Sequence, residues 1–107
     1  MLASRNVQVT VASILDSLKN SDMEEAKRKI QALAPEVKND REKGSLQAAA
    51  GIYWSVTKAK EGTMQTWDAA KLERAANSVT SSQFSDEFDQ AYAETLLSYS
   101  RLMQKLQ

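Results

Sequence analysis

The densest group of side chains that could do chemistry in this sequence is acidic: Asp86, Glu87, Asp89 and Glu94. Carboxylate oxygens bind calcium and magnesium, but neither the ligand spacing of a calcium-binding loop nor a phosphate-cradling glycine loop accompanies these four. Acids at the start of a helix also compensate the positive end of the helix dipole. We therefore interpret the group as an exposed helix start and expect no metal and no cofactor.

Histidine and cysteine are both absent from the sequence. Histidine is the usual general base near neutral pH and the commonest zinc ligand, and cysteine supplies the reactive thiolate of many enzymes. Most arrangements of catalytic residues are therefore excluded. The sequence predicts a protein that is not an enzyme.

The charges of the chain balance, with 14 Lys and Arg against 14 Asp and Glu. A chain without net positive charge has no overall field to hold nucleic acid or an anionic membrane surface. The basic triplet 27–29 follows Glu24 and Glu25 at helical pairing distance, so we expect a solvated face there. No apolar run is long enough to span a bilayer, no secretory leader is evident, and cysteine is lacking, so a cytoplasmic location is expected.

Four aromatic residues support one hypothesis about binding. Tyr53 and Trp54 could stack on a base or cofactor ring, yet both belong to a broad apolar arc, which favours packing in the core. Together with Tyr92 and Tyr99 they could instead line an internal pocket for an apolar or aromatic small molecule. A ligand-binding helical bundle is therefore the alternative function.

Two apolar residues, Trp67 and Leu97, lie far from the centre of the apolar face of their own predicted helices. Trp67 could fold against Met64 and Leu97 could contact a neighbouring helix. Both could instead belong to a surface that binds another protein, because aromatic anchors dominate such interfaces. The leading hypothesis is a non-catalytic interaction or adaptor module that uses Trp67, Leu97 and Met64 to bind another protein or a second copy of itself.

Helices must position all of these side chains, because glycine and proline are scarce and apolar residues recur at steps of three and four. The sequence predicts one all-α domain with helices at about 6–19, 22–38, 45–60, 66–80 and 85–105. Short connections predict a five-helix bundle, or two helical hairpins plus a closing C-terminal helix.

The predicted helices differ in how much of their surface is apolar. The first has a single face, formed by Val7, Val11, Ile14, Leu15 and Leu18, whereas apolar residues cover more than half of the third, which should be central. Pro35 predicts an end or a kink of the second helix near Ala34, and whether that helix continues further stays open. The charged run 38–44 is predicted to be a charged connector or an exposed helical turn with a solvated surface.

Two short resemblances point to the same class of protein. The segment Ser21-Asp22-Met23-Glu24-Glu25-Ala26, continued by Ile30, Leu33 and Pro35, resembles the second helix of a tetratricopeptide repeat. The order of helices two to five, with Trp67-Asp68-Ala69-Ala70 and Arg101-Leu102, resembles a C-terminal helical domain shared by the steroid receptor RNA activator protein and the COPII outer-coat scaffold subunit. That family carries Trp-Met-Val-Gly in its last helix, where this chain has Ala93-Glu94-Thr95-Leu96-Leu97. Both resemblances imply a non-catalytic interaction domain.

Overall fold

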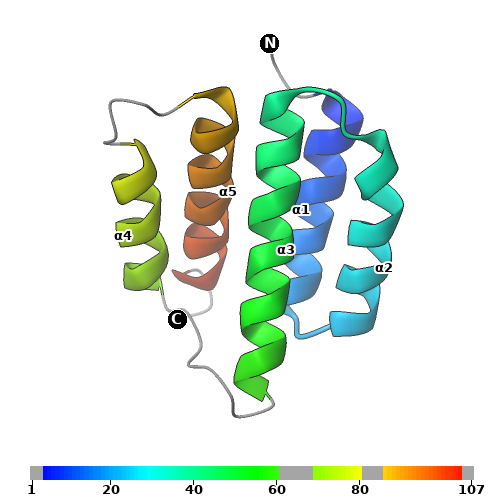
Figure 1. The fold of residues 1–107 in the computed structure, drawn as a ribbon. Helices are drawn as coiled ribbons and strands as arrows, with labels where there is room; N and C mark the ends of the chain where they lie inside the picture. The colour runs from blue at the N-terminus through cyan, green and yellow to red at the C-terminus, as the bar shows by residue number, and fades with distance from the viewer. Residues whose placement is uncertain (1–3, 61–68, 81–85, 105–107) are drawn as a thin grey trace.

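The computed structural model describes residues 4–60, 69–80 and 86–104, and within them every regular element is helical. The elements are α1 (Arg5–Lys19), α2 (Met23–Leu33), a 3₁₀ turn η1 (Ala34–Glu36), α3 (Asp40–Lys60), α4 (Ala69–Thr80) and α5 (Glu87–Gln104). The predicted all-α fold is confirmed (Figure 1).

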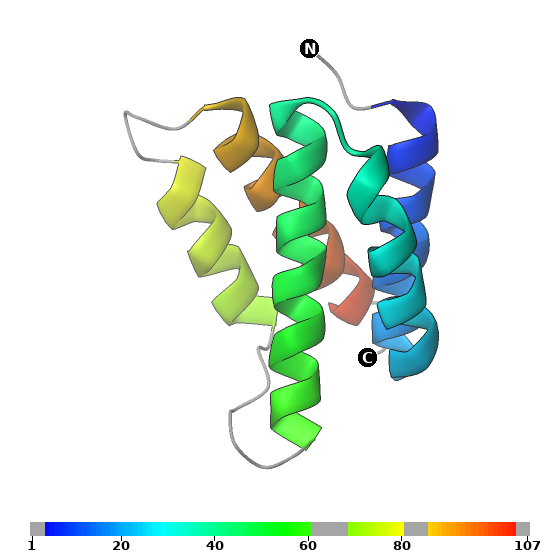
Figure 2. The same ribbon diagram turned by 45° about the vertical axis from the view of Figure 1, so that its right-hand side comes forward.

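The long helix α3 lies at the centre, with α1 and α2 on one side and α5 and α4 on the other (Figures 1 and 2). Helices α1, α3 and α5 run in the same direction, and α2 and α4 return against them. The most extensive packing joins α5 to α3 and to α4, while α3 and α4 barely touch. The described residues therefore form a five-helix bundle in which α5 is an internal partner of three helices rather than a closing piece at the end.

The N-terminal hairpin follows the sequence prediction closely. All five apolar residues of the predicted face of α1 are buried, and Ser4 caps this helix by accepting a hydrogen bond from the amide of Val7. Helix α2 is capped by Asp22, whose carboxylate accepts from the amide of Glu25 at 3.3 Å. It ends at Leu33, and Pro35 lies in the 3₁₀ turn that follows, which confirms the predicted end near Ala34.

A seam of small residues brings α3 and α5 close together. Gly44, Ala48, Gly51 and Ser55 recur at steps of four, three and four, and therefore share one side of α3. A Cβ atom added to Gly44 would overlap the carbonyl oxygen of Phe88, whereas one added to Gly51 would lie 3.9 Å from the hydroxyl oxygen of Tyr92. Gly44 is thus required for the close approach of the two backbones.

Of the two alternatives for residues 38–44, a charged connector or an exposed helical turn, the helical one holds from Asp40 onward, where α3 begins, and Asp40 and Lys43 are exposed. The predicted solvated surface is wrong at Gly44, which is buried. Arg41 and Glu42 are also largely withdrawn from solvent, since the Arg41 side chain is 15% exposed and Glu42 is 4% exposed. Charge alone suggested a solvated surface, but both side chains have specific partners within the protein.

Within the described ranges, no helix is both long and apolar enough to cross a membrane.

Candidate functional site

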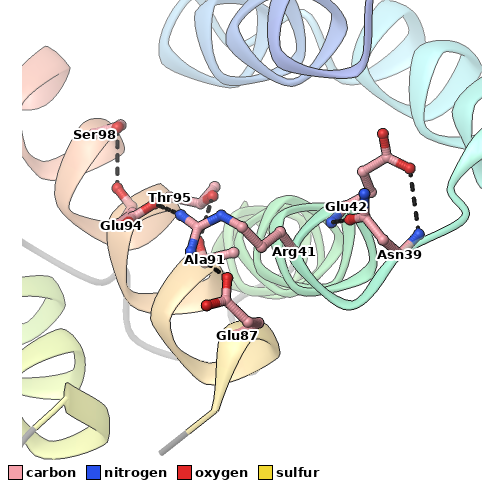
Figure 3. Close-up of polar contacts among 8 residues, drawn as sticks. All are labelled: Asn39, Arg41, Glu42, Glu87, Ala91, Glu94, Thr95 and Ser98. Carbon is pink, nitrogen blue, oxygen red and sulfur yellow. Dashed lines mark hydrogen bonds and ion pairs between the residues drawn. The ribbon is translucent and has the colours of Figure 1, made fainter. Parts of the chain in front are cut away.

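The start of α3 is held by a reciprocal pair of hydrogen bonds between Asn39 and Glu42 (Figure 3). The amide of Glu42 donates to the side-chain oxygen of Asn39 at 2.9 Å, and the amide of Asn39 donates to the Glu42 carboxylate at 3.4 Å. This is the capping-box arrangement, in which two otherwise unpaired helix-start amides are satisfied. The spacing Asn39-x-x-Glu42 was the signal in the sequence that could have located the start of α3.

Glu42 also joins three segments of the chain. Its carboxylate accepts from the amide of Lys38 and from the amide of Ser4, each at 2.8 Å. These backbone hydrogen bonds, the one from Ser4 above all, lower the pKa of Glu42 and outweigh the opposing effect of burial. The buried carboxylate is therefore ionised and ties the start of α1 to the start of α3.

Arg41, the residue before Glu42, reaches the other half of the molecule (Figure 3). Its guanidinium donates to the carboxylate of Glu87 at 3.0 Å and to that of Glu94, both on α5. The hydrogen bond to Glu87 is the main cause that raises the pKa of Arg41. Two neighbouring side chains of one helical turn thus attach α3 to α1 and to α5.

A groove runs along α1 and α5 beneath these contacts. Its first part has a volume of about 230 Å³ and includes Arg41, Ser45 and Thr95 in its walls. A second part of about 330 Å³ includes Leu15, Asp16, Arg101 and Leu102, and Ser98 lines both. The walls mix apolar, hydroxyl and oppositely charged groups, so the groove carries no single recognisable ligand chemistry.

The acidic group found in the sequence is used for contacts within the protein. Asp86 caps α5 by accepting from the amide of Asp89 at 3.0 Å, while Glu87 and Glu94 bind Arg41. No group of three or more potential metal ligands comes together among the described residues.

The four aromatic residues of the hypothetical ligand pocket lie at different depths. Tyr99 is buried, Tyr53 and Tyr92 are half-buried against the core, and Trp54 is exposed. Tyr92 stacks on Phe88, with ring centroids 6.4 Å apart. Where the walls of a groove are described, none of the four contributes to them.

Trp54 was predicted to pack in the core, and that prediction is wrong, because 56% of the residue is exposed. The inner side of α3 is formed by residues such as Ala49 and Ile52, and the helical period turns Trp54 away from them. The Lys58 ammonium lies over the indole, 4.4 Å from the ring centre. In the sequence, the only sign of this cation–π pair is that Trp54 and Lys58 are four residues apart, the spacing of neighbours on a helix.

Trp54 belongs to a solvent-facing side of α3 that we call the Trp54 face: Lys43, Gln47, Trp54 and Lys58. Lys43 and Gln47 are exposed and Lys58 is partly exposed. The steps of four, seven and four residues place these side chains along one line of the helix. The other large apolar residue that is exposed in the described ranges is Val9 of α1, at 61%.

Of the three residues predicted to bind a partner, only Leu97 lies within the described part of the chain; Trp67 and Met64 lie outside it. Leu97 is partly buried and packs against the core, which agrees with the alternative that it contacts a neighbouring helix. It precedes Gln104 by two helical turns, and Gln104 donates to Glu73 of α4 at 3.1 Å. Leu97 is therefore on the side of α5 that α4 covers.

The basic triplet divides between solvent and the inside of the N-terminal hairpin. Lys27 and Arg28 are exposed, as predicted, and Arg28 pairs with Glu25. Lys29 is half-buried and donates to the hydroxyls of Ser13 at 2.7 Å and Ser17 at 3.0 Å on α1. Lys29 therefore serves helix packing rather than ligand binding.

Comparisons of the chain with protein-family models, with curated proteins and with solved structures give no match.

Proposed function

We propose that this protein is a non-catalytic helical interaction module that binds another protein through the Trp54 face, and that it acts in the cytoplasm. The observation that carries the proposal is the exposure of Trp54 on the central helix of the bundle. Tryptophan is enriched among the residues that dominate binding energy in protein interfaces. The lack of cysteine suits a reducing compartment.

The free energy gained when a partner covers Trp54 is large enough for an anchor residue of an interface. Covering the exposed part of an aromatic side chain removes on the order of 100 Å² of apolar surface from water. At ~25 cal/mol per Å² this is worth about 2–3 kcal/mol, which exceeds one factor of ten in affinity. The ring is also held in place by Lys58, so less side-chain freedom is lost on binding.

The alternative proposal, a bundle that binds a small aromatic or apolar molecule, has less support. Such a site needs convergent side chains around one cavity. Trp54 lies at the surface and Tyr99 in the core, so these two do not converge.

Site-specific photocrosslinking tests the interaction. A photoreactive phenylalanine analogue is placed at Gln47, two helical turns from Trp54 on the same face, and the protein is irradiated in its native host. We expect a discrete adduct with a protein that mass spectrometry identifies, either another chain or a second copy. The same probe at Val9 is the matched control on a different helix, and there we expect no such adduct.

The variant Trp54→Ala, combined with the probe at position 47, should lose the adduct while the helical circular dichroism spectrum is retained. An adduct that persists in Trp54→Ala, or the absence of any adduct at position 47, would overturn the proposed function.

A further inference from the structure

The packing of the bundle is uneven along the chain. Across the boundary after η1, α1 packs on α3 and to a small extent on α5, and α2 packs on α3. All of this packing together is less extensive than that of α5 on α3 alone, and every other boundary between successive described elements is crossed by more. The bundle therefore divides into an N-terminal hairpin, residues 4–36, and a three-helix lobe formed by α3, α4 and α5 (Figure 1).

Grooves follow the boundary between the N-terminal hairpin and the three-helix lobe. The groove described above lies between α1 and α5. A further hollow of about 370 Å³ lies between the start of α1, η1 and the start of α3, and its walls include Asn6, Pro35 and Lys38. Side chains that line such spaces lack the contacts that a closely packed interface provides. The grooves therefore weaken the attachment of the hairpin to the rest of the bundle.

The connection between the two parts has the features of a hinge. Residues 37–39 lie between η1 and α3 and are not helical, and Val37 has extended backbone angles. Pro35 lacks an amide hydrogen, so α2 cannot continue through this segment as a regular helix. Hinges are short segments at the ends of regular elements whose backbone angles absorb a movement. Residues 37–39 fit this description.

Glu42 fastens the hairpin at the hinge. Its carboxylate accepts hydrogen bonds from the amides of Lys38 and Asn39 in the hinge, and from the amide of Ser4 at the start of α1. The contacts of Arg41, by contrast, stay within the three-helix lobe. A rotation of the hairpin about the hinge must therefore break the hydrogen bond between Ser4 and Glu42.

We infer that the N-terminal hairpin is a lid that opens about residues 37–39 and is latched by Glu42. When the lid is closed, it covers the apolar face of α1, which includes Val7, Val11 and Leu15. The burial of these residues keeps the closed state predominant. Opening exposes an apolar surface distinct from the Trp54 face, which is accessible in the closed bundle. The inference thus goes beyond the proposed function, because it adds a surface whose accessibility depends on the opening equilibrium.

Native-state hydrogen exchange of the full chain, followed by mass spectrometry at urea concentrations below the unfolding transition, tests the lid. The amides of α1 and α2 should exchange together and with less protection than those of α5, because they exchange through opening of the lid rather than through unfolding of the whole chain. Equal protection of the hairpin and α5 would overturn the inference.

Two variants distinguish opening of the lid from global unfolding. Glu42→Gln should accelerate exchange in α1 and α2 by about tenfold, because it weakens hydrogen bonds to a charged acceptor. Ala76→Gly, at a buried position of α4, should accelerate exchange in α5 by about fivefold. It should leave exchange in α1 and α2 unchanged, since the three-helix lobe carries the same substitution whether the lid is open or closed.

Each variant has an outcome that contradicts the inference. If Ala76→Gly accelerated exchange in α1 and α2 as much as in α5, the hairpin would open only when the whole chain unfolds, and there would be no lid. If Glu42→Gln left exchange in α1 and α2 at the wild-type rate, Glu42 would not be the latch. Neither result depends on the photocrosslinking at position 47, so the proposed function is decided separately.

Discussion

At the scale of single residues, Glu42 is a buried side chain whose charge is satisfied by the backbone. It is a buried carboxylate that accepts hydrogen bonds from the backbone amides of Ser4, Lys38 and Asn39. A buried, charged acceptor of this kind is far more effective than its neutral isostere, because hydrogen bonds to charged groups contribute about 1.5–3 kcal/mol. The same contacts explain why its pKa is lowered on folding.

The first prediction is that Glu42→Gln lowers the free energy of unfolding at pH 7 by about 1–3 kcal/mol. Because the pKa is lower in the folded state than in the unfolded chain, the contribution of Glu42 is fully present above the unfolded value, near 4.5. It is lost as the pH falls through the folded value. In urea titrations, the difference in free energy of unfolding between the wild type and the variant should therefore shrink below about pH 4.

The exposed Glu87 provides the control for this experiment. Glu87→Gln should change stability by less than about 1 kcal/mol, since surface ion pairs contribute little. If Glu42→Gln lowered the free energy of unfolding by the same amount at pH 3 and at pH 7, the charge of Glu42 would not be the source of its contribution to stability.

The second prediction separates exposed from buried apolar residues. Trp54→Ala and Val9→Ala should each alter stability by less than about 0.5 kcal/mol, as surface substitutions usually do. Leu72→Ala, which empties a fully buried position on α4, should cost about 2–5 kcal/mol. Thermal and urea unfolding followed by circular dichroism measure all three. If Trp54→Ala lowered the stability as much as Leu72→Ala does, the indole would be part of the core.

At the scale of helices, the third prediction concerns the two glycines of the seam between α3 and α5. Gly44→Ala should destabilise the protein by about 1–3 kcal/mol, since the added methyl group would overlap the Phe88 carbonyl and force the helices apart. Gly51→Ala has room for its methyl group and should be neutral or stabilising by up to about 1 kcal/mol, because alanine favours the helix. Similar behaviour of the two variants in urea titrations would contradict the assigned packing.

The sequence was most informative for helices that bury a single face. In α1 the period of the apolar residues identified every buried apolar position, because this helix buries a single face. In α2 a proline marked the end through its missing amide hydrogen. The buried face of α1 depends on one partner surface, and the end of α2 depends on the local chemistry of the proline.

Helices with several partners were harder to interpret from sequence. Helix α5 packs on α3, α4 and α1, so the centre of its apolar arc does not identify which residues are covered, and for that reason the sequence left open whether Leu97 contacts another helix. On α3, small residues mark the seam with α5, and the large Trp54 lies outside it. Glu42 pairs with Ser4, and Arg41 pairs with Glu87 and Glu94, over 38 to 53 positions in sequence, and no local pattern predicts these three pairings.

At the scale of the whole molecule, the fourth prediction is that folding does not depend on a metal ion. The sequence has no histidine or cysteine, and the acids at the start of α5 are engaged with Arg41 and with the helix start. The thermal midpoint measured by circular dichroism should be unchanged in EDTA and after addition of calcium or magnesium. A midpoint that falls by several degrees in EDTA and recovers with calcium would show that a cation site exists.

The parallel course of α3 and α5 has a consequence for the order in which the chain folds. Gly44 and Phe88 meet in the seam although they are 44 positions apart, whereas α4 and α5 are consecutive antiparallel helices. Closing the longer loop costs more chain entropy, so the α4–α5 hairpin should form first and dock on α3 afterwards. In stopped-flow experiments Leu72→Ala should therefore mainly slow refolding, and Gly44→Ala should mainly accelerate unfolding. The rate at which the native bundle opens would then be set by the seam, and a single methyl group at position 44 would shorten the lifetime of the folded state.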